Sequence, residues 1–212
     1  MDKHATGKFI VFEGGECVGK TSQIKLLAER LRVFGHDVVV TKEPGGGGEE
    51  PRRIRELLLS GTLSPKEEIE LFIKNRRLHV ANLIRPSLEK GCIILCDRFS
   101  DSTFAYQCYA RNLGIESAQL LDADARQGVA PDLVIVLDMP VERALERLSQ
   151  RKGEVSAFDR EKREFHERVR AGFRAVAKAF SHNHVVLNAD ASQESVATAV
   201  WGVIVERFPG IV

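Results

Sequence analysis

The stretch FEGGECVGKTSQ, residues 12–23, contains three glycines followed by a lysine and a threonine. Residues 14–21 match the pattern G-x-x-x-x-G-K-[ST], in which backbone N–H groups of a glycine-rich loop surround nucleotide phosphates. The match follows an apolar run, KFIVFE (8–13), and precedes a segment with apolar residues at helical spacing, Ile24 and Leu27. A strand before the loop and a helix after it are what this mechanism requires, so the stretch predicts a nucleoside triphosphate site. The alternative is a connecting turn with an incidental lysine.

Each part of this phosphate loop has an expected role. The glycines let successive N–H groups converge on the phosphates, and Lys20 is expected to reach the β- and γ-phosphates. The Thr21 hydroxyl is expected to bind Mg²⁺. The residues expected to contact ATP here are Gly14, Gly15, Glu16, Cys17, Val18, Gly19, Lys20, Thr21 and Ser22.

Outside the loop, short apolar segments alternate with helix-length amphipathic segments. Strands are expected at 8–13, 36–42, 92–97, 132–138 and 184–188. Near-continuous apolar strands separated by helices indicate a parallel sheet that is covered on both faces. We therefore predict an α/β fold, a doubly wound five-stranded parallel sheet with helices on both faces, as in P-loop NTP hydrolases.

Helix and domain boundaries also have local signals. SPKE (64–67) is a capping box with proline at the first helical position, and it opens a long helix toward Gly91. A short helix is expected to stop at Gly61, and the last helix runs from about Ser192 to Arg207. We expect residues 1–7 to be a loose extension and 8–212 to form a single P-loop domain. The irregular stretch at about 150–160 is expected to be a mobile lid loop.

Composition excludes several classes of protein. The 212 residues are 43% hydrophobic and 29% charged, with a formal net charge of +1, so neither a nucleic-acid nor a membrane surface is indicated. No signal peptide or transmembrane run is present, which predicts a cytoplasmic protein. The cysteines at 17, 92, 96 and 108 lack zinc spacing, and small buried residues in a reducing compartment are the expectation.

Three further clusters are candidates for an acceptor site. Residues 42–44, Lys-Glu-Pro, follow the second strand, with Arg55 on the next helix, and Arg98 follows the third strand. Arginine binds phosphate oxygens bidentately, so Arg55 and Arg98 suit a monophosphate. Phe72 and Arg76 lie one helical turn apart, an arrangement suited to stacking on a flat base and hydrogen-bonding its edge. The alternatives are a structural Asp-Arg ion pair and ordinary packing of Phe72 and Arg76.

Asp97 ends an apolar strand, the position of a Walker-B carboxylate. We expect Asp97 to bind Mg²⁺ directly or through water, and to orient Arg98.

The chain resembles the thymidylate kinase family over nearly its whole length. The resemblance rests on FEGGECVGKTSQ, KEPGG, IRELLL, ELFIKNRR, CDRFSDSTFAYQ, PDLVIVLD and ERLSQRKGE. The combination of EPGG with DRF-x-x-ST-x-AYQ is specific to this family among nucleoside-monophosphate kinases. The resemblance implies ATP with Mg²⁺ as donor, dTMP as acceptor, dTDP as product and a homodimer.

The resemblance also implies roles around the thymine base. Phe72 is expected to stack on the base and Arg76 to hydrogen-bond its edge. Ser102 and Gln107 are expected to complete the base pocket. Tyr106 is expected to lie under the sugar, where its bulk disfavours a ribose 2′-hydroxyl.

Further roles concern the phosphates, the sugar and adenine. The resemblance implies that Glu16 faces the 3′-hydroxyl of the sugar, that Arg55 and Arg98 hold the acceptor phosphate, and that Arg147 packs against adenine. Glu43 and Pro44 are expected to contact the acceptor nucleotide.

The phosphate loop of this chain lacks the arginine that some family members have there, so the lid is expected to supply the missing charge. We predict that Arg151 is the arginine finger, with Lys152 and Arg160 as alternatives. Arg151→Ala should lower kcat by about 10²-fold or more and leave dTMP affinity nearly unchanged.

Several positions depart from the family pattern. Lys42 replaces an arginine, Gly47-Gly48 extends a glycine run where threonine is usual, and Ala157 stands where the lid commonly has arginine. Cys17 in the phosphate loop is unusual, and two expectations stand for it: a lowered thiol pKa with sensitivity to oxidation, or a small filler in a tight loop.

Two other functions fit parts of the sequence. One is a deoxynucleotide kinase with altered base preference, because base specificity depends on few contacts. The other is a P-loop ATPase or nucleotide-binding regulator, which would not need Phe72, Arg76 or the DRF…AYQ stretch. The N-K-x-D stretch that usually indicates guanine recognition does not occur.

Overall fold

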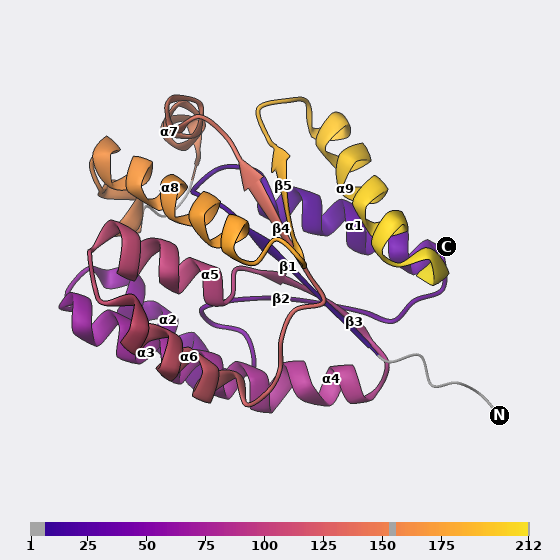
Figure 1. The fold of residues 1–212 in the computed structure, drawn as a ribbon, viewed down its shortest axis with the longest axis horizontal. Helices are drawn as coiled ribbons and strands as arrows, with labels where there is room; N and C mark the ends of the chain where they lie inside the picture. The colour runs from indigo at the N-terminus through magenta and orange to yellow at the C-terminus, as the bar shows by residue number, and fades with distance from the viewer. Residues whose placement is uncertain (1–6, 153–155, 212) are drawn as a thin grey trace.

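Strand β1 (Lys8–Glu13), the apolar segment before the phosphate loop, is the central strand of a five-stranded sheet (Figure 1). β3 (Ile93–Asp97) and β4 (Leu133–Asp138) pair with its two edges. β2 (Val38–Lys42) and β5 (His184–Asn188) are the outer strands. All pairings are parallel, which confirms the predicted fold class.

The computed structural model describes residues 7–152 and 156–211. Most of the expected N-terminal extension (1–6) and part of the expected lid loop (153–155) lie outside the described residues. The α-helices are α1 (Lys20–Val33), α2 (Glu49–Ser60), α3 (Pro65–His79), α4 (Arg85–Glu89), α5 (Ser100–Thr103), α6 (Ile115–Arg126), α7 (Val141–Gln150), α8 (Arg163–Ala179) and α9 (Gln193–Arg207).

Helices cover both faces of the sheet because successive strand residues point to opposite sides and both sides are apolar. Ile10 and Phe12 of β1 face a core completed by α1 and α9. Phe9 and Val11 face a second core that includes residues of α8. Figure 1 shows α1 and α9 together on one side of the sheet, and α8 and α5 on the other.

Local signals account for the helix ends. The Ser64 hydroxyl accepts from the Glu67 N–H (3.4 Å) and the Glu67 carboxylate accepts from the Ser64 N–H (2.8 Å), which confirms the capping box. The long helix that begins there continues through a π-helical segment, Val80–Ile84, into α4. α2 ends before Gly61, whose φ of 76° is in the left-handed region that favours glycine. A second π-helical segment, Phe104–Ala110, continues α5.

The carboxyl ends of β1, β2 and β3 lie at one edge of the sheet, since all strands are parallel. The connections from β1 and β3 leave this edge in opposite directions along the sheet, which is where doubly wound folds bind ligands. Within the part of the chain that the structure describes, no helix is both long enough and apolar enough to span a bilayer.

Candidate active site

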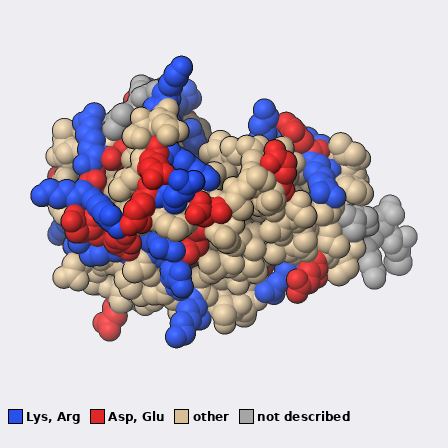
Figure 2. All heavy atoms as spheres, turned by 90° about the horizontal axis from the view of Figure 1, so that it is seen from above, with Lys and Arg blue, Asp and Glu red and all other residues tan. Residues whose placement is uncertain are grey.

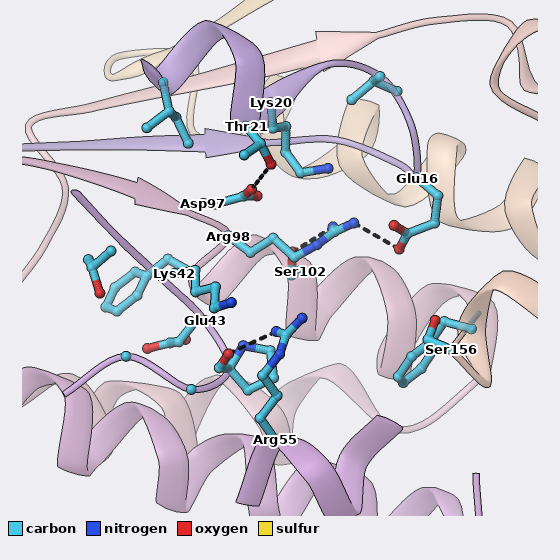
Figure 3. Close-up of a pocket in the computed structure, with 18 of the residues that line it drawn as sticks. Glu16, Lys20, Thr21, Lys42, Glu43, Arg55, Asp97, Arg98, Ser102 and Ser156 are labelled. Carbon is cyan, nitrogen blue, oxygen red and sulfur yellow. Dashed lines mark hydrogen bonds and ion pairs between the residues drawn. The ribbon is translucent and has the colours of Figure 1, made fainter. Parts of the chain in front are cut away.

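A cavity of about 1180 Å³ opens at the carboxyl edge of the sheet. The phosphate loop forms one wall, and the β2–α2 loop with α2 and α3 forms the opposite wall. The start of α5 and the segment 156–160 complete it. Figure 3 shows the polar side chains of these elements converging on one space.

The phosphate loop has the backbone that its glycines predict. Gly14 has a φ of 132°, and a Cβ there would lie 2.4 Å from the Leu137 carbonyl oxygen, so no other residue fits without a shift of backbone. Nζ of Lys20 donates to the carbonyl oxygens of Gly14 (3.1 Å) and Gly15 (2.7 Å). Burial lowers the pKa of Lys20, and the nearby Arg98 guanidinium lowers it further. These two contacts use two of the three donors of the ammonium group.

The side chains of Thr21 and Asp97 are in contact where the phosphate loop continues into α1. The Thr21 hydroxyl donates to Oδ2 of Asp97 at 2.9 Å, and both oxygens line the cavity (Figure 3). Mg²⁺ binds oxygens at about 2.0–2.1 Å in octahedral geometry, so neighbouring ligands lie about 2.9 Å apart. Among residues 7–152 and 156–211, no group of three or more His, Cys, Asp or Glu could hold a metal. The 2.9 Å separation of the Thr21 and Asp97 oxygens suits two neighbouring ligands of a Mg²⁺ ion.

Arg98 lies beside the phosphate loop. Its guanidinium donates to the Gly14 carbonyl oxygen (2.8 Å), to Oε1 of Glu16 (2.8 Å) and to the Ser102 hydroxyl (3.2 Å). Glu16 and carbonyl groups of the loop thus orient Arg98, and the expectation that Asp97 orients it is wrong. Asp97 is directed to Thr21 instead.

The turn that carries Arg98 is held by a buried carboxylate. Arg98 has a φ of 71°, a left-handed backbone conformation that is uncommon for a non-glycine residue. Glu13, fully buried at the end of β1, accepts from the Phe99 N–H (2.8 Å) and the Ser102 hydroxyl (2.6 Å). Burial, and then the neighbouring Asp101, raise the pKa of Glu13 to about 8.

Glu16 is the second carboxylate of this region. It accepts from Arg98 and from the Tyr106 hydroxyl at 2.7 Å. Burial alone would raise the pKa of Glu16, but the charges of Arg98 and Lys20 and the Tyr106 hydrogen bond outweigh it and lower the pKa to about 2. Glu16 is therefore an ionised acceptor at the cavity wall.

Arg76 is the centre of a buried ion-pair network. Its guanidinium is 1% exposed and donates to Glu43 (2.9 Å), Asp122 (2.7 Å), the Phe99 carbonyl oxygen (3.0 Å) and Thr103 (3.0 Å). Charge pairing with Glu43 and Asp122 outweighs the effect of burial and raises the pKa of Arg76. These N–H groups of Arg76 are directed to protein acceptors. A hydrogen bond from Arg76 to a base stays a prediction.

Lys42 at the end of β2 and Arg55 on α2 bring further positive charge to the cavity. Nη1 of Arg55 donates to the Pro44 carbonyl oxygen at 2.9 Å, which holds the arginine against the loop. A Cβ at Gly46 would lie 2.4 Å from Oγ1 of Thr41, so this position of the glycine run needs the absence of a side chain. Figure 3 shows Lys42 and Arg55 across the cavity from Lys20 and Arg98.

Comparisons with known proteins agree with this arrangement. A family model described as Thymidylate kinase matches residues 12–200. The chain belongs to the thymidylate kinase family. A thymidylate kinase from Caulobacter vibrioides is 43% identical over 206 residues, covering 95% of this chain and 98% of that protein. One from Pelotomaculum thermopropionicum is 45% identical over 195 residues, covering 90% and 89%. The crystal structure of thymidylate kinase from Ehrlichia chaffeensis has a TM-score of 0.77 at 33% identity, covering 93% of this chain and 98% of that one.

Most of the predicted thymidylate kinase residues line the cavity. Phe72, Ser102, Tyr106 and Gln107 are among them. Arg147, half-buried on α7, is not among the lining residues, so its predicted contact with adenine remains untested. Three of these side chains donate hydrogen bonds to the protein: the Ser102 hydroxyl to Glu13, the Tyr106 hydroxyl to Glu16, and Nε2 of Gln107 to Glu68 at 3.3 Å.

The expectation of a lowered pKa for Cys17 is wrong. The thiol lies in the loop and is partly covered, and burial raises its pKa despite the neighbouring Arg151. The other expectation, a small filler in a tight loop, is consistent with a φ of 54° at this residue.

Sequence reasoning missed the buried partners of the site. Glu13 supports the Arg98 turn, Asp122 on α6 pairs with Arg76, and His79 contacts Glu43 at 3.1 Å and Thr41 at 2.8 Å. His79 follows Arg76 by three residues on one helix, so helical spacing could have placed it on the same face. Asp122 is 46 residues from Arg76, and no local pattern connects them.

Proposed function

We propose that this chain transfers the γ-phosphoryl group of ATP to dTMP and releases ADP and dTDP. The observation that carries the proposal is that donor-side residues of the phosphate loop, Lys20 and Thr21, share one cavity with two arginines suited to an acceptor phosphate. Arg98 lies beside the phosphate loop, and Arg55 lies across the cavity from it. A regulator that only hydrolyses a nucleoside triphosphate would need the donor-side residues, Lys20 and Thr21, but not the acceptor-side arginines. Membership in the thymidylate kinase family supports dTMP as the acceptor.

The reaction needs alignment more than covalent chemistry from the protein. An oxygen of the dTMP phosphate forms a bond to Pγ of ATP, and the bond from Pγ to the bridging oxygen of ADP breaks. Lys20 would bind the β- and γ-phosphates, while Arg55 and Arg98 would hold the acceptor phosphate. Arg151, which lines the cavity beside the phosphate loop, would add positive charge in the transition state.

Thr21 and Asp97 would hold Mg²⁺, which when bound neutralises charge on the β- and γ-phosphate oxygens. The chain's own hydrogen bond between these residues already brings the two oxygens to a suitable separation.

The acceptor nucleoside is proposed to lie between Phe72 and Tyr106. Phe158 packs against both rings, with centroid separations of 6.4 Å to Phe72 and 5.5 Å to Tyr106, so the three form an aromatic wall. Ionised Glu16 would accept a hydrogen bond from the 3′-hydroxyl of the sugar.

A homodimer is part of the proposal. Its support in this chain is the exposure of Leu57 on α2 and of Leu120 and Leu121 on α6. Light scattering coupled to size-exclusion chromatography measures the oligomeric state directly. A cytoplasmic location is also proposed, because the matched relatives are bacterial thymidylate kinases.

Nucleic acid and membrane surfaces are not proposed as partners. On the face seen in Figure 2, Lys and Arg side chains are interspersed with Asp and Glu, rather than gathered into a field of one sign.

The decisive experiment measures ADP release from ATP and Mg²⁺ with dTMP, dUMP, dCMP, dGMP or no acceptor. Strong turnover with dTMP, weaker turnover with dUMP and little with the others would support the proposal. Preference for another deoxynucleotide would favour a kinase with altered base preference. Turnover without any acceptor would favour an ATPase and would remove the kinase function.

A further inference from the structure

Asp159 is a buried carboxylate at the wall of the cavity, with a side chain that is 3% exposed. Its Oδ2 accepts from the Ser156 N–H (2.7 Å), the Ser156 hydroxyl (2.7 Å) and Nη2 of Arg151 (2.6 Å). Its Oδ1 is buried and has no hydrogen-bond partner among the residues that the structure describes. Because burying a carboxylate is costly unless a cation compensates it, Asp159 and Arg151 act as one unit.

Arg151 is held at both ends. Its backbone N–H donates to the Leu148 carbonyl oxygen at 3.1 Å, which fixes it to the end of α7. While Nη2 binds Asp159, Nη1 lies 3.9 Å from Sγ of Cys17 in the phosphate loop. The guanidinium is a rigid planar fork, so fixing one nitrogen determines where the other points. The contact with Asp159 therefore directs the second nitrogen of Arg151 toward the loop.

The segment that carries Asp159 rests on elements of the acceptor wall. The Ala157 N–H donates to the Leu59 carbonyl oxygen of α2 at 3.4 Å. The ring of Phe158 is buried and meets the Tyr106 ring edge-on. Asp159 thus connects the packing of its segment on the acceptor wall to the orientation of Arg151 near the phosphate loop.

We infer that Asp159 is a positioning residue that aims the Arg151 guanidinium at the phosphoryl group in transfer. The inference rests on the proposed function, because it requires phosphoryl transfer in this cavity. The unpartnered Oδ1 can accept a second guanidinium N–H, which would make the pair bidentate. The same contact favours Arg151 over Lys152 and Arg160 as the source of transition-state charge.

The test is a double-mutant cycle on the full chain. Initial rates against dTMP and ATP are measured for the wild type, Asp159→Ala, Asp159→Asn, Arg151→Ala and the Asp159→Ala/Arg151→Ala double variant. Asp159→Asn keeps one acceptor oxygen for Ser156 but removes the charge and the second acceptor oxygen. Asp190→Ala is the control, because that carboxylate pairs with Arg143 outside the cavity. Thermal unfolding shows whether each variant is folded.

The expected result is a fall in kcat of about tenfold or more in both Asp159 variants, with KM for dTMP within about threefold of wild type. The double variant should be no slower than Arg151→Ala, since Asp159 acts through Arg151. Asp190→Ala should keep wild-type rates.

Two results would overturn the inference. One is a kcat at or above wild type in both Asp159 variants. The other is an equal fold decrease in kcat from Asp159→Ala in the wild-type and the Arg151→Ala backgrounds. Failure of the proposed function is distinguishable from either, because the wild type itself would then release no ADP in response to dTMP.

Discussion

The Thr21 hydroxyl donates a 2.9 Å hydrogen bond to the carboxylate of Asp97, 76 positions further along the chain. This contact joins the first turn of α1 to the last residue of β3. It places two hard oxygen ligands side by side where the phosphate loop begins its helix, a suitable donor set for Mg²⁺.

Asp97→Asn should therefore raise the Mg²⁺ concentration for half-maximal rate by about tenfold or more, because an amide oxygen carries no charge to attract the cation. The measurement is an Mg²⁺ titration of the initial rate at fixed ATP and dTMP. Asp37→Asn, exposed near the opposite end of the sheet, is the matched control. An unchanged Mg²⁺ requirement in Asp97→Asn would contradict the assignment.

Arg55→Ala should raise KM for dTMP by about tenfold or more, because a charge-assisted hydrogen bond to phosphate contributes roughly 1.5–3 kcal/mol. Arg53 lies on the same helix but is exposed and paired with Glu49, so Arg53→Ala should leave KM near wild type. Steady-state rates against dTMP compare the two variants. If both shift KM equally, Arg55 has no special role in acceptor binding.

Asp122→Ala should lower the free energy of unfolding by about 3–5 kcal/mol, because it leaves the buried charge of Arg76 with one carboxylate fewer. The control is Asp124→Ala on the same helix. Asp124 pairs with Arg77 at the exposed surface, where a pair contributes about 1 kcal/mol or less. Urea unfolding of the two variants measures the difference, and similar losses would argue against a buried network.

The raised pKa of Glu13 predicts a specific dependence of folding stability on pH. Its pKa is about 8 in the folded chain against an ordinary value of 4.5, with Asp101, Arg98, Ser102 and Phe99 as the groups facing it. The folded state keeps a proton that the unfolded state releases, so the stabilisation is complete below pH 4.5 and is lost as pH rises through about 8. The slope cannot exceed about 1.4 kcal/mol per pH unit for one proton.

Glu13→Gln should therefore lose less stability between pH 6 and pH 8 than the wild type does, as measured by urea unfolding at each pH. Glu70→Gln, on the exposed face of α3, should follow the wild-type pH dependence. Parallel curves for wild type and Glu13→Gln would show that Glu13 does not hold the proton.

The fold was predictable because its signals are local and repeated. Apolar runs marked every strand to within two residues, and the Ser64 capping box and Gly61 marked helix ends. The start of α2 at Glu49 was not predicted, although Glu49, Glu50 and Pro51 fit the first turn of a helix. The π-helical segments had no signal that could be read in advance.

The candidate site was predictable where a sequence motif specifies the local backbone conformation. A glycine-rich loop between a strand and a helix determines where Lys20 and Thr21 lie, because only neighbouring residues are involved. Parallel strands ending at one edge bring Asp97 and Arg98 to the same place. The wrong expectation, that Asp97 orients Arg98, came from treating sequence neighbours as contacts, whereas the two side chains point to different partners.

The sequence by itself determined the parallel sheet, the phosphate loop and the residue types around the cavity, because these depend on periodicity and on backbone conformation over a few residues. Only the tertiary structure decided which buried charges pair, such as Arg76 with Asp122 and Arg151 with Asp159. Such pairs form because a low-dielectric interior makes an uncompensated charge costly. Packing of distant segments supplies each partner, and no local pattern in the sequence identifies it.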